Sequence, residues 1–147
     1  MFRLWLSKQH SNFCATGKSM ARCGQSDDDR CPSCWRAWER AEHLCICPSE
    51  QGTQLYLDNV QELELWMESK DSTSPELAYR TAKYLHGRGG ISFSEFEPLS
   101  PEMTELAHSQ DIIGWRNMLE GRVSKHFYMI QRSYLSTQPE LRLTGED

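Results

Sequence analysis

Residues 31–48 read CPSCWRAWERAEHLCICP, and the spacing of cysteine and histidine in this stretch decides how the chain is expected to fold. Cys31 and Cys34 are separated by two residues, and His43 and Cys47 follow in the pattern C-x2-C-x8-H-x3-C. Thiolate sulfur and imidazole nitrogen are the donors that a tetrahedral zinc ion prefers in proteins. We therefore predict that these four side chains bind one zinc ion.

The first two ligands have the sequence of a zinc knuckle, a tight turn that places two sulfurs on one ion. We expect the backbone N–H groups of Ser33 and Cys34 to turn toward the sulfur of Cys31. Pro32 has no N–H group and fixes the bend. The sequence therefore predicts a zinc-knuckle element near the start of the fold.

The other two ligands are predicted to lie on a helix over residues 36–47. His43 and Cys47 are four residues apart, so both face the same side of such a helix. Cys45 lies about 200° around the helix axis from each of them. We therefore expect Cys45 to point into the bundle as a small apolar residue and not to bind the metal.

A shell of three cysteines and one histidine is closed, whereas catalytic zinc keeps one coordination position open for water. The predicted site is therefore structural. Metal binding to such a site supplies folding free energy directly, at an apparent ~10–16 kcal/mol for comparable zinc sites.

All six cysteines lie before residue 48, which bears on their chemistry. Clustered cysteine and histidine residues in a reducing compartment usually bind metal, whereas disulfides would have to hold the whole fold. The competing interpretation is a set of unrelated buried cysteines and a surface histidine. Cys14 and Cys23 could form a second, incomplete site with His10, but free buried thiols are the preferred interpretation.

The sequence has no segment typical of a secreted or membrane-spanning protein. The mean hydropathy is negative, and no long apolar run is present. The first residues, MFRLWLSKQH, carry an apolar patch that Arg3 interrupts and Lys8 ends, which is too short for a signal-peptide core. We expect an intracellular protein of the nucleus or cytoplasm, with no membrane partner.

Outside the metal-binding stretch, apolar residues recur at intervals of three and four, which predicts helices. Residues 74–76 and 100–102 each read Ser-Pro-Glu, which supplies an N-cap, a proline at the first helical position and an acid in the first turn. The other expected elements are a helix over residues 1–22 with Gly17 as a break, a helix of about four turns after Pro48 carrying Leu55, Val60, Leu63, Trp66 and Met67 on one face, an extended connector over residues 91–99, and a last helix with Val123, Phe127, Ile130 and Tyr134 on one face.

These elements predict a mainly α fold, a small bundle of about four or five helices with the zinc knuckle near its N-terminus. The expected core includes Leu77, Ala78, Thr81, Ala82, Leu85, Met103, Leu106, Ile113 and Leu119, with Gly121 as a helix stop. We expect residues 1–48 to be the basic, cysteine-rich segment, residues 49–137 to pack on it in one domain, and residues 138–147 to be a disordered tail.

Charge is divided unevenly along the chain. Residues 1–48 contain seven basic and five acidic residues, whereas residues 49–147 contain nine basic and sixteen acidic residues. Nucleic-acid binding depends on neutralising phosphates, so the N-terminal third is the part expected to contact them. The candidate contacts are Lys18, Arg22, Arg30, Arg36 and Arg40; the competing interpretation is a solvated charged face.

Trp35 and Trp38 lie among these basic residues, three positions apart. On the predicted helix they share one face, so we expect them to pack in the core. The alternative is that they stack on nucleic-acid bases.

Residues 31–48 resemble the zinc-binding segment on the C-terminal side of the polymerase in non-LTR and related retroelement proteins. The matching positions are Cys31, Cys34, Glu42, His43, Leu44, Cys47 and Pro48. Residues 110–135, QDIIGWRNMLEGRVSKHFYMIQRSYL, are similar to C-terminal regions of retroelement-like proteins from algae and other protists. That pattern is carried by Gln110, Ile113, Gly114, Trp115, Gly121, Ser124, Lys125, Gln131 and Tyr134.

The resemblance implies the C-terminal portion of a reverse transcriptase without its polymerase. A polymerase holds two metal ions on paired aspartates of a β-hairpin, and the chain has no Tyr-x-Asp-Asp sequence. Residues 15–19, ATGKS, lack the upstream glycine of a phosphate-binding loop. We expect no enzymatic activity, and either binding of RNA or DNA through the basic N-terminal third or, alternatively, a protein-interaction or structural module that binds no nucleic acid.

Overall fold

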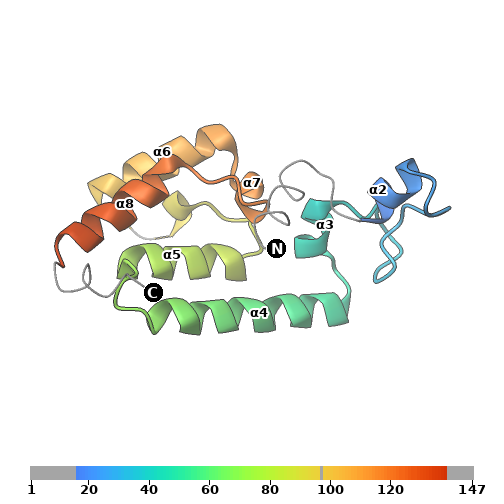
Figure 1. The fold of residues 1–147 in the computed structure, drawn as a ribbon, viewed down its shortest axis with the longest axis horizontal. Helices are drawn as coiled ribbons and strands as arrows, with labels where there is room; N and C mark the ends of the chain where they lie inside the picture. The colour runs from blue at the N-terminus through green and yellow to red at the C-terminus, as the bar shows by residue number, and fades with distance from the viewer. Residues whose placement is uncertain (1–15, 97, 139–147) are drawn as a thin grey trace. The chain divides into compact units, whose positions relative to one another are not determined.

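The computed structural model describes residues 16–96 and 98–138, and this part of the chain is mainly helical, as predicted (Figure 1). The elements are α2 (Gly17–Arg22), α3 (Ala41–Ile46), α4 (Glu50–Glu68), α5 (Pro75–His86), the 3-10 turn η1 (Phe93–Glu95), α6 (Pro101–Ile113), α7 (Trp115–Leu119) and α8 (Lys125–Ser136). These described residues contain no β-strand, and their β-pairing is limited to an isolated antiparallel bridge between Arg30 and Trp38. The predicted tail lies, except for Gln138, outside the described residues.

The chain forms two compact units. The first unit comprises residues 1–58 and 116–122, and the second comprises residues 59–115 and 123–147. The helices α2 and α3 belong to the first unit, and α5, α6 and α8 belong to the second. In the described parts of the chain, no helix has both the length and the apolar character needed to cross a membrane.

The second unit has a core of large side chains. In it α8 packs against α6 and α5, and η1 packs against α6. Phe93 of η1 is fully buried, and its ring lies 4.7 Å from the ring of Trp115, 5.8 Å from that of Phe127 and 6.3 Å from that of Tyr84, between centroids. The Tyr84 hydroxyl donates a hydrogen bond to the backbone oxygen of Trp115. The aromatic cluster therefore joins η1, α5, Trp115 and α8.

Both Ser-Pro-Glu sequences begin helices, as predicted. The helix α5 starts at Pro75 after Ser74, and α6 starts at Pro101 after Ser100. The hydroxyl of Ser100 accepts a hydrogen bond from the N–H of Met103 at 3.4 Å, which satisfies a donor of the first turn. Of the predicted core, Leu77, Ala78, Ala82, Met103 and Leu106 are buried, and Thr81, Leu85, Ile113 and Leu119 are half-buried.

A single helix from residue 101 to Gly121 does not form, because Gly114 ends α6. Gly114 has φ +93°, a conformation that glycine adopts without a steric penalty. The buried amide of Gln110 secures this break: its nitrogen donates to the Gly114 oxygen at 3.3 Å, and its oxygen accepts from the N–H of Ser124 at 2.9 Å. A second amide, that of Gln131, accepts from the N–H of Ser74 at 3.1 Å and so ties α8 to the start of α5.

Three expectations about helices are wrong. Gly17 begins α2 instead of breaking a helix, because the hydroxyl of Thr16 caps the N–H of Ser19 at 3.4 Å; residues 1–15 of that expectation lie outside the described range. Val123 precedes α8 and is 49% exposed, since the helix begins only after the Ser124 cap. In place of a fully extended connector, residues 93–95 form the turn η1.

The helix α4 forms after Pro48 as predicted, but its expected apolar face is largely exposed. Val60 is its buried residue, whereas Leu55 is 64% exposed and Trp66 is 56% exposed. Apolar periodicity therefore predicted the presence of this helix but not how much of its face is covered.

Candidate metal centre

Cys31 and Cys34 lie on a tight loop that backbone hydrogen bonds close. The N–H of Cys31 donates to the oxygen of Ala37, and the N–H of Trp35 donates to the oxygen of Cys31, each at 2.8 Å. These two bonds turn the chain back on itself between the cysteines. The loop therefore presents both sulfurs on one side, as the predicted zinc knuckle requires.

The helix predicted over residues 36–47 is shorter than expected and begins only at Ala41. Residues before it pair with the chain ahead of Cys31: the N–H of Glu39 donates to the oxygen of Asp29 at 2.8 Å. Arg40 is extended, with φ −106° and ψ 164°, and precedes the first helical residue. The returning segment of the loop, residues 37–40, therefore pairs with residues 29–31 through backbone groups that a longer helix would have used.

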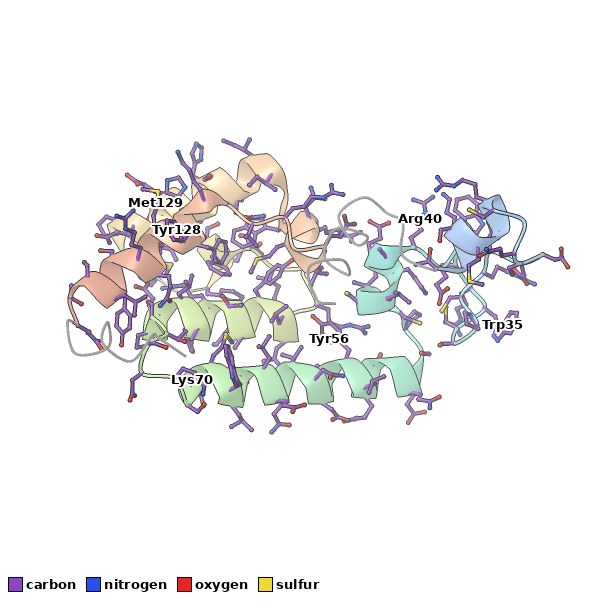
Figure 2. All side chains as sticks on the ribbon, in the orientation of Figure 1. Trp35, Arg40, Tyr56, Lys70, Tyr128 and Met129 are labelled. Carbon is purple, nitrogen blue, oxygen red and sulfur yellow. The ribbon has the colours of Figure 1, made fainter. Side chains whose placement is uncertain are left out.

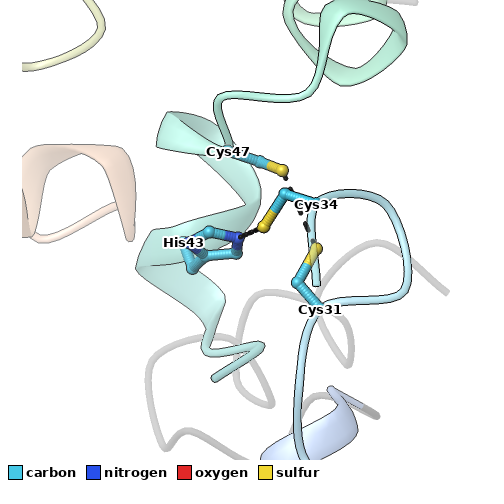
Figure 3. A group of neighbouring side chains, drawn as sticks. All are labelled: Cys31, Cys34, His43 and Cys47. Carbon is cyan, nitrogen blue, oxygen red and sulfur yellow. Dashed lines mark hydrogen bonds between the residues drawn. The ribbon is translucent and has the colours of Figure 1, made fainter. Parts of the chain in front are cut away.

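His43 lies on α3, and Cys47 directly follows its last residue. Both side chains are buried, with 8% of His43 and 4% of Cys47 exposed. Figure 3 shows the imidazole and the Cys47 sulfur directed toward the two sulfurs of the loop. The four-residue spacing thus places this pair on one side of α3 even though the helix is short.

The four side chains form one cluster. The sulfurs of Cys31 and Cys47 are 3.7 Å apart, and the sulfur of Cys34 lies 3.3 Å from Nε2 of His43 (Figure 3). One ligand atom from each residue falls within 4.8 Å of the other three. Cys31 is 2% exposed, and Cys34 is half-buried. This cluster could hold a single metal ion.

Backbone N–H groups surround the sulfur of Cys31 as the sequence predicts. Burial raises the pKa of the Cys31 thiol, and the N–H groups of Cys34 and Ser33, which donate to its sulfur, act to lower that pKa without cancelling the effect of burial. The same N–H groups would stabilise a metal-bound thiolate, because each donates a hydrogen bond to negative sulfur.

Ser49 is a part of the site that the sequence analysis missed. Burial acts to raise the pKa of Cys47, but the hydroxyl and the N–H of Ser49 outweigh it, together with the Cys31 and Cys34 thiols, and hold that pKa at about 6. The Ser49 oxygen lies 3.4 Å from the Cys47 sulfur. The available signal was the tripeptide Cys-Pro-Ser, which occurs at residues 31–33 and again at residues 47–49. In both copies, the serine N–H reaches the sulfur two residues earlier.

The two other cysteines in the described part of the chain, Cys23 and Cys45, lie outside the cluster. Cys45 is half-buried on α3 and is not among the four clustered residues. Cys23 follows α2 and is exposed, so its interpretation as a buried thiol is wrong. Cys14 and His10, the other members of the suggested second site, lie outside the described residues.

The expected core position of Trp35 and Trp38 is also wrong. Trp35 is 59% exposed and Trp38 is 55% exposed. Neither residue is helical, because Trp35 occupies the turn of the loop with φ +55° and Trp38 lies in the extended returning segment of the loop. The helical face that would have carried both rings into a core does not exist.

All five candidate phosphate contacts are exposed: Lys18, Arg22, Arg30, Arg36 and Arg40. Two of them have acidic neighbours. Arg30 pairs with Asp28 at 2.6 Å, and Arg40 lies 3.9 Å from Glu42. The hydrogen bonds from Arg30 hold the pKa of Asp28 at about 2, well below its usual range.

In comparisons with known proteins, no family model, no curated protein and no solved structure matches this chain. The resemblance to retroelement reverse transcriptases therefore stays a prediction.

Proposed function

We propose that Cys31, Cys34, His43 and Cys47 bind one structural zinc ion. Zn–S bonds of about 2.3 Å and Zn–N bonds of about 2.1 Å in a tetrahedron separate the ligand atoms by about 3.6–3.8 Å. Two of the observed separations, 3.7 Å between two sulfurs and 3.3 Å between sulfur and nitrogen, are close to these values, and all four ligand atoms lie within 4.8 Å of one another. Four protein ligands leave no position for water, so we propose a structural role and no catalysis at this site.

Metal analysis of two matched variants tests the ligand assignment. We expect stoichiometric zinc in the wild type and in Cys45→Ser, and loss of zinc in Cys31→Ser, because Cys31 belongs to the cluster and Cys45 does not. Zinc retained at full stoichiometry in Cys31→Ser, or lost in Cys45→Ser, would contradict the assignment.

We further propose that the first unit is an accessory module that binds nucleic acid through its exposed basic side chains. The carrying observation is that the ammonium of Lys18 and the guanidinium of Arg40 lie 5.1 Å and 5.2 Å from the centroid of the exposed Trp38 ring. Cations beside exposed aromatic rings are typical of nucleic-acid-binding surfaces. The resemblance of residues 31–48 to a reverse transcriptase segment agrees with this proposal.

The number of charges alone would not support binding. Residues 16–48 contain five acidic residues as well as five basic ones. The placement of the acidic residues matters more than their number. The carboxylate of Glu39 accepts a hydrogen bond from the N–H of Gly17, and Asp28 forms an ion pair with Arg30. Since few phosphates can be contacted, we expect modest affinity with a shallow dependence on salt concentration.

A salt titration with labelled single-stranded RNA and duplex DNA tests the proposal. We expect Arg36→Gln and Arg40→Gln each to weaken binding and to reduce the salt slope by about one. Arg132→Gln is the matched control, because it removes the same charge from an exposed position of the second unit. Absence of binding at low salt, or equal effects of all three changes, would contradict the proposal.

A second candidate function is protein interaction, and exposed apolar residues of the second unit favour it. Tyr128 is 65% exposed and Met129 is 49% exposed on α8 (Figure 2), and Ile112 on α6 is 79% exposed. Residues 49–147 are also acidic, which disfavours nucleic acid there. Recovery of a protein partner without nucleic acid, lost on Met129→Asp while zinc is retained, would support this alternative; a monomer that binds no partner would count against it.

A further inference from the structure

We propose that the first unit prefers single-stranded nucleic acid and holds its unpaired bases by stacking them on Trp35 and Trp38. This inference rests on the proposed nucleic-acid binding and names its substrate class. Five side chains carry it, and they are called here the aromatic–basic strip: Lys18, Arg30, Trp35, Trp38 and Arg40.

The backbone pairing places the members of the strip on one face. Arg30 and Trp38 oppose each other in the antiparallel bridge, and directly opposed residues project to the same side. The guanidinium carbon of Arg30 lies 5.6 Å from the centroid of the Trp35 ring. The two tryptophans are therefore linked through one arginine that neighbours both.

The other two cations extend the strip beyond Trp38. Arg40 is two residues after Trp38 in the extended returning segment of the loop, so it projects to the same side as Trp38. Its guanidinium carbon lies 5.2 Å from the Trp38 ring centroid, and the ammonium of Lys18 lies 5.1 Å from it. Glu39, between Trp38 and Arg40, projects the other way, where its carboxylate accepts from the N–H of Gly17. The acid between Trp38 and Arg40 is thus turned away from the strip.

Both rings are open to a ligand. More than half of each side chain is exposed, 59% for Trp35 and 55% for Trp38, and Figure 2 shows Trp35 projecting from the loop. The left-handed backbone at Trp35, φ +55°, is sterically unfavourable for a residue with a Cβ, whereas glycine adopts it freely. A backbone outlier that displays an exposed aromatic ring points to a role for that ring in binding.

The chemistry of the strip fits a single strand. Stacking needs the face of an unpaired base, which a duplex buries between its neighbouring base pairs. The cations beside the rings suit the phosphates between stacked bases. Arg30 is held by Asp28 at 2.6 Å, so its part in the strip is to brace Trp35. Lys18 and Arg40 are the phosphate contacts, since Glu42 lies 3.9 Å from Arg40, at the limit of an ion pair.

The test compares a labelled oligouridine with an RNA duplex of equal length, using the full chain loaded with zinc. We expect tighter binding of the single strand. Trp38→Ala should weaken that binding roughly 5- to 150-fold, the range found when a stacked aromatic residue is removed, and leave the salt slope unchanged because tryptophan neutralises no phosphate. Trp38→Phe should restore most of the affinity, since phenylalanine keeps an aromatic face. Trp35→Ala should weaken binding as Trp38→Ala does, and Trp35→Phe should restore it as Trp38→Phe does.

Trp66 supplies a matched control. It is also exposed, at 56%, and also has a cation beside it, with the ammonium of Lys70 at 6.0 Å from the ring centroid, but it belongs to the second unit. Trp66→Ala should therefore leave binding unchanged. Zinc stoichiometry of every variant shows that a loss of binding is not a loss of the metal-binding fold.

The outcomes separate this inference from the proposed function. Equal affinity for single strand and duplex, with salt-dependent binding that survives loss of both tryptophans, overturns the stacking inference and leaves nucleic-acid binding in place. Absence of binding to either form at low salt overturns both. Tryptophan-dependent binding of an acidic peptide, without binding of the oligonucleotide, assigns the strip to a protein partner and also overturns the inference.

Discussion

The two units of the chain bury different kinds of side chain. Among the described residues of the first unit, the buried apolar residues are Cys31, Ala41 and Cys47. The second unit buries much larger apolar side chains, including Tyr84, Phe93, Met103 and Leu106. Apolar burial contributes about 25 cal/mol per Å², so these side chains supply far more stabilisation than an alanine and two cysteines.

The difference indicates that the units are stabilised by different interactions. A unit with so small an apolar core usually needs a metal or a disulfide to fold. Among the described residues of the first unit, two of the three buried apolar residues are members of the Cys/His cluster that could hold a metal ion. We therefore expect the first unit to depend on the proposed zinc ion and the second to depend on side-chain packing.

Removal of the metal should have the largest effect and should separate the units. On chelation, the N–H groups of Cys31, Trp35 and Glu39, which close the loop, should exchange hydrogen rapidly, because the apparent ~10–16 kcal/mol of zinc binding is lost. The N–H of Leu106 in α6 should stay protected. Hydrogen exchange measured with and without chelator checks this. Cooperative loss of protection in both units would show that they do not differ as proposed.

Phe93→Ala should have the next largest effect, and in the opposite unit. Phe93 is fully buried against three aromatic rings, and truncation of such a side chain costs about 3–5 kcal/mol. Denaturant unfolding, monitored by a spectroscopic signal from the second unit, measures the loss in free energy of unfolding. Zinc affinity should not change, and a variant that loses zinc together with stability would contradict the distinction.

Gln110→Leu tests whether polar contacts matter within the packed unit. The buried amide accepts from the N–H of Ser124, which would be left unsatisfied at a cost of about 1–3 kcal/mol. Gln131→Leu is the matched variant: it removes a similar bond to the N–H of Ser74 from a half-buried position, and should cost about 0.5–1.5 kcal/mol. Thermal unfolding of both variants measures the order, and a larger loss for Gln131→Leu would contradict the ranking by burial.

The smallest of these effects concerns pH and the metal. Without metal the pKa of Cys47 is about 6 instead of 9, so its thiolate is available above pH 6. Ser49→Ala removes the hydroxyl that lowers this pKa, so protons compete with zinc between pH 6 and 9, at up to about tenfold in affinity per pKa unit. The loss should already be large at pH 6.5, should grow as the pH falls toward 6, and should vanish above pH 9.

Competition between the protein and a chelator for zinc, at pH 6.5 and above pH 9, measures this dependence. Ser49→Thr keeps a hydroxyl at the same position and serves as the control. A loss of affinity in Ser49→Ala that is equal at both pH values would mean that Ser49 acts through the start of α4, where its oxygen accepts from the N–H of Gly52 at 3.1 Å, and not through Cys47.

Local patterns were sufficient for much of the fold and for the cluster. Two ligands at C-x2-C spacing and two at four-residue spacing depend only on short-range geometry, so Cys31, Cys34, His43 and Cys47 meet as predicted. The serine-proline starts of α5 and α6 are local for the same reason.

What the sequence analysis missed depends on which distant backbone groups pair. The residues around Trp38 have helix-forming neighbours, but their backbone instead pairs with that of residues 29–31. This pairing turned Trp35 and Trp38 from expected core residues into exposed ones. Ser49 was missed because its role follows from a repeated tripeptide and not from a ligand pattern.

Residues of the pattern over 110–135 have architectural roles in the second unit. Gln110 secures the end of α6, Trp115 packs in the aromatic cluster, Ser124 caps α8, and Gln131 ties α8 to α5. Likeness to another protein at these positions would therefore predict a shared helical scaffold and would say little about a shared ligand.

The left-handed residue Trp35 sets stability and binding against each other at one position. Glycine would relieve about 1 kcal/mol of backbone strain there, so Trp35→Gly should make the zinc-loaded first unit slightly more stable. The same change removes an exposed ring. A search for thermostable variants would therefore favour glycine at this position, whereas a search for tight strand binding would restore the tryptophan, and the two selections should diverge at this residue.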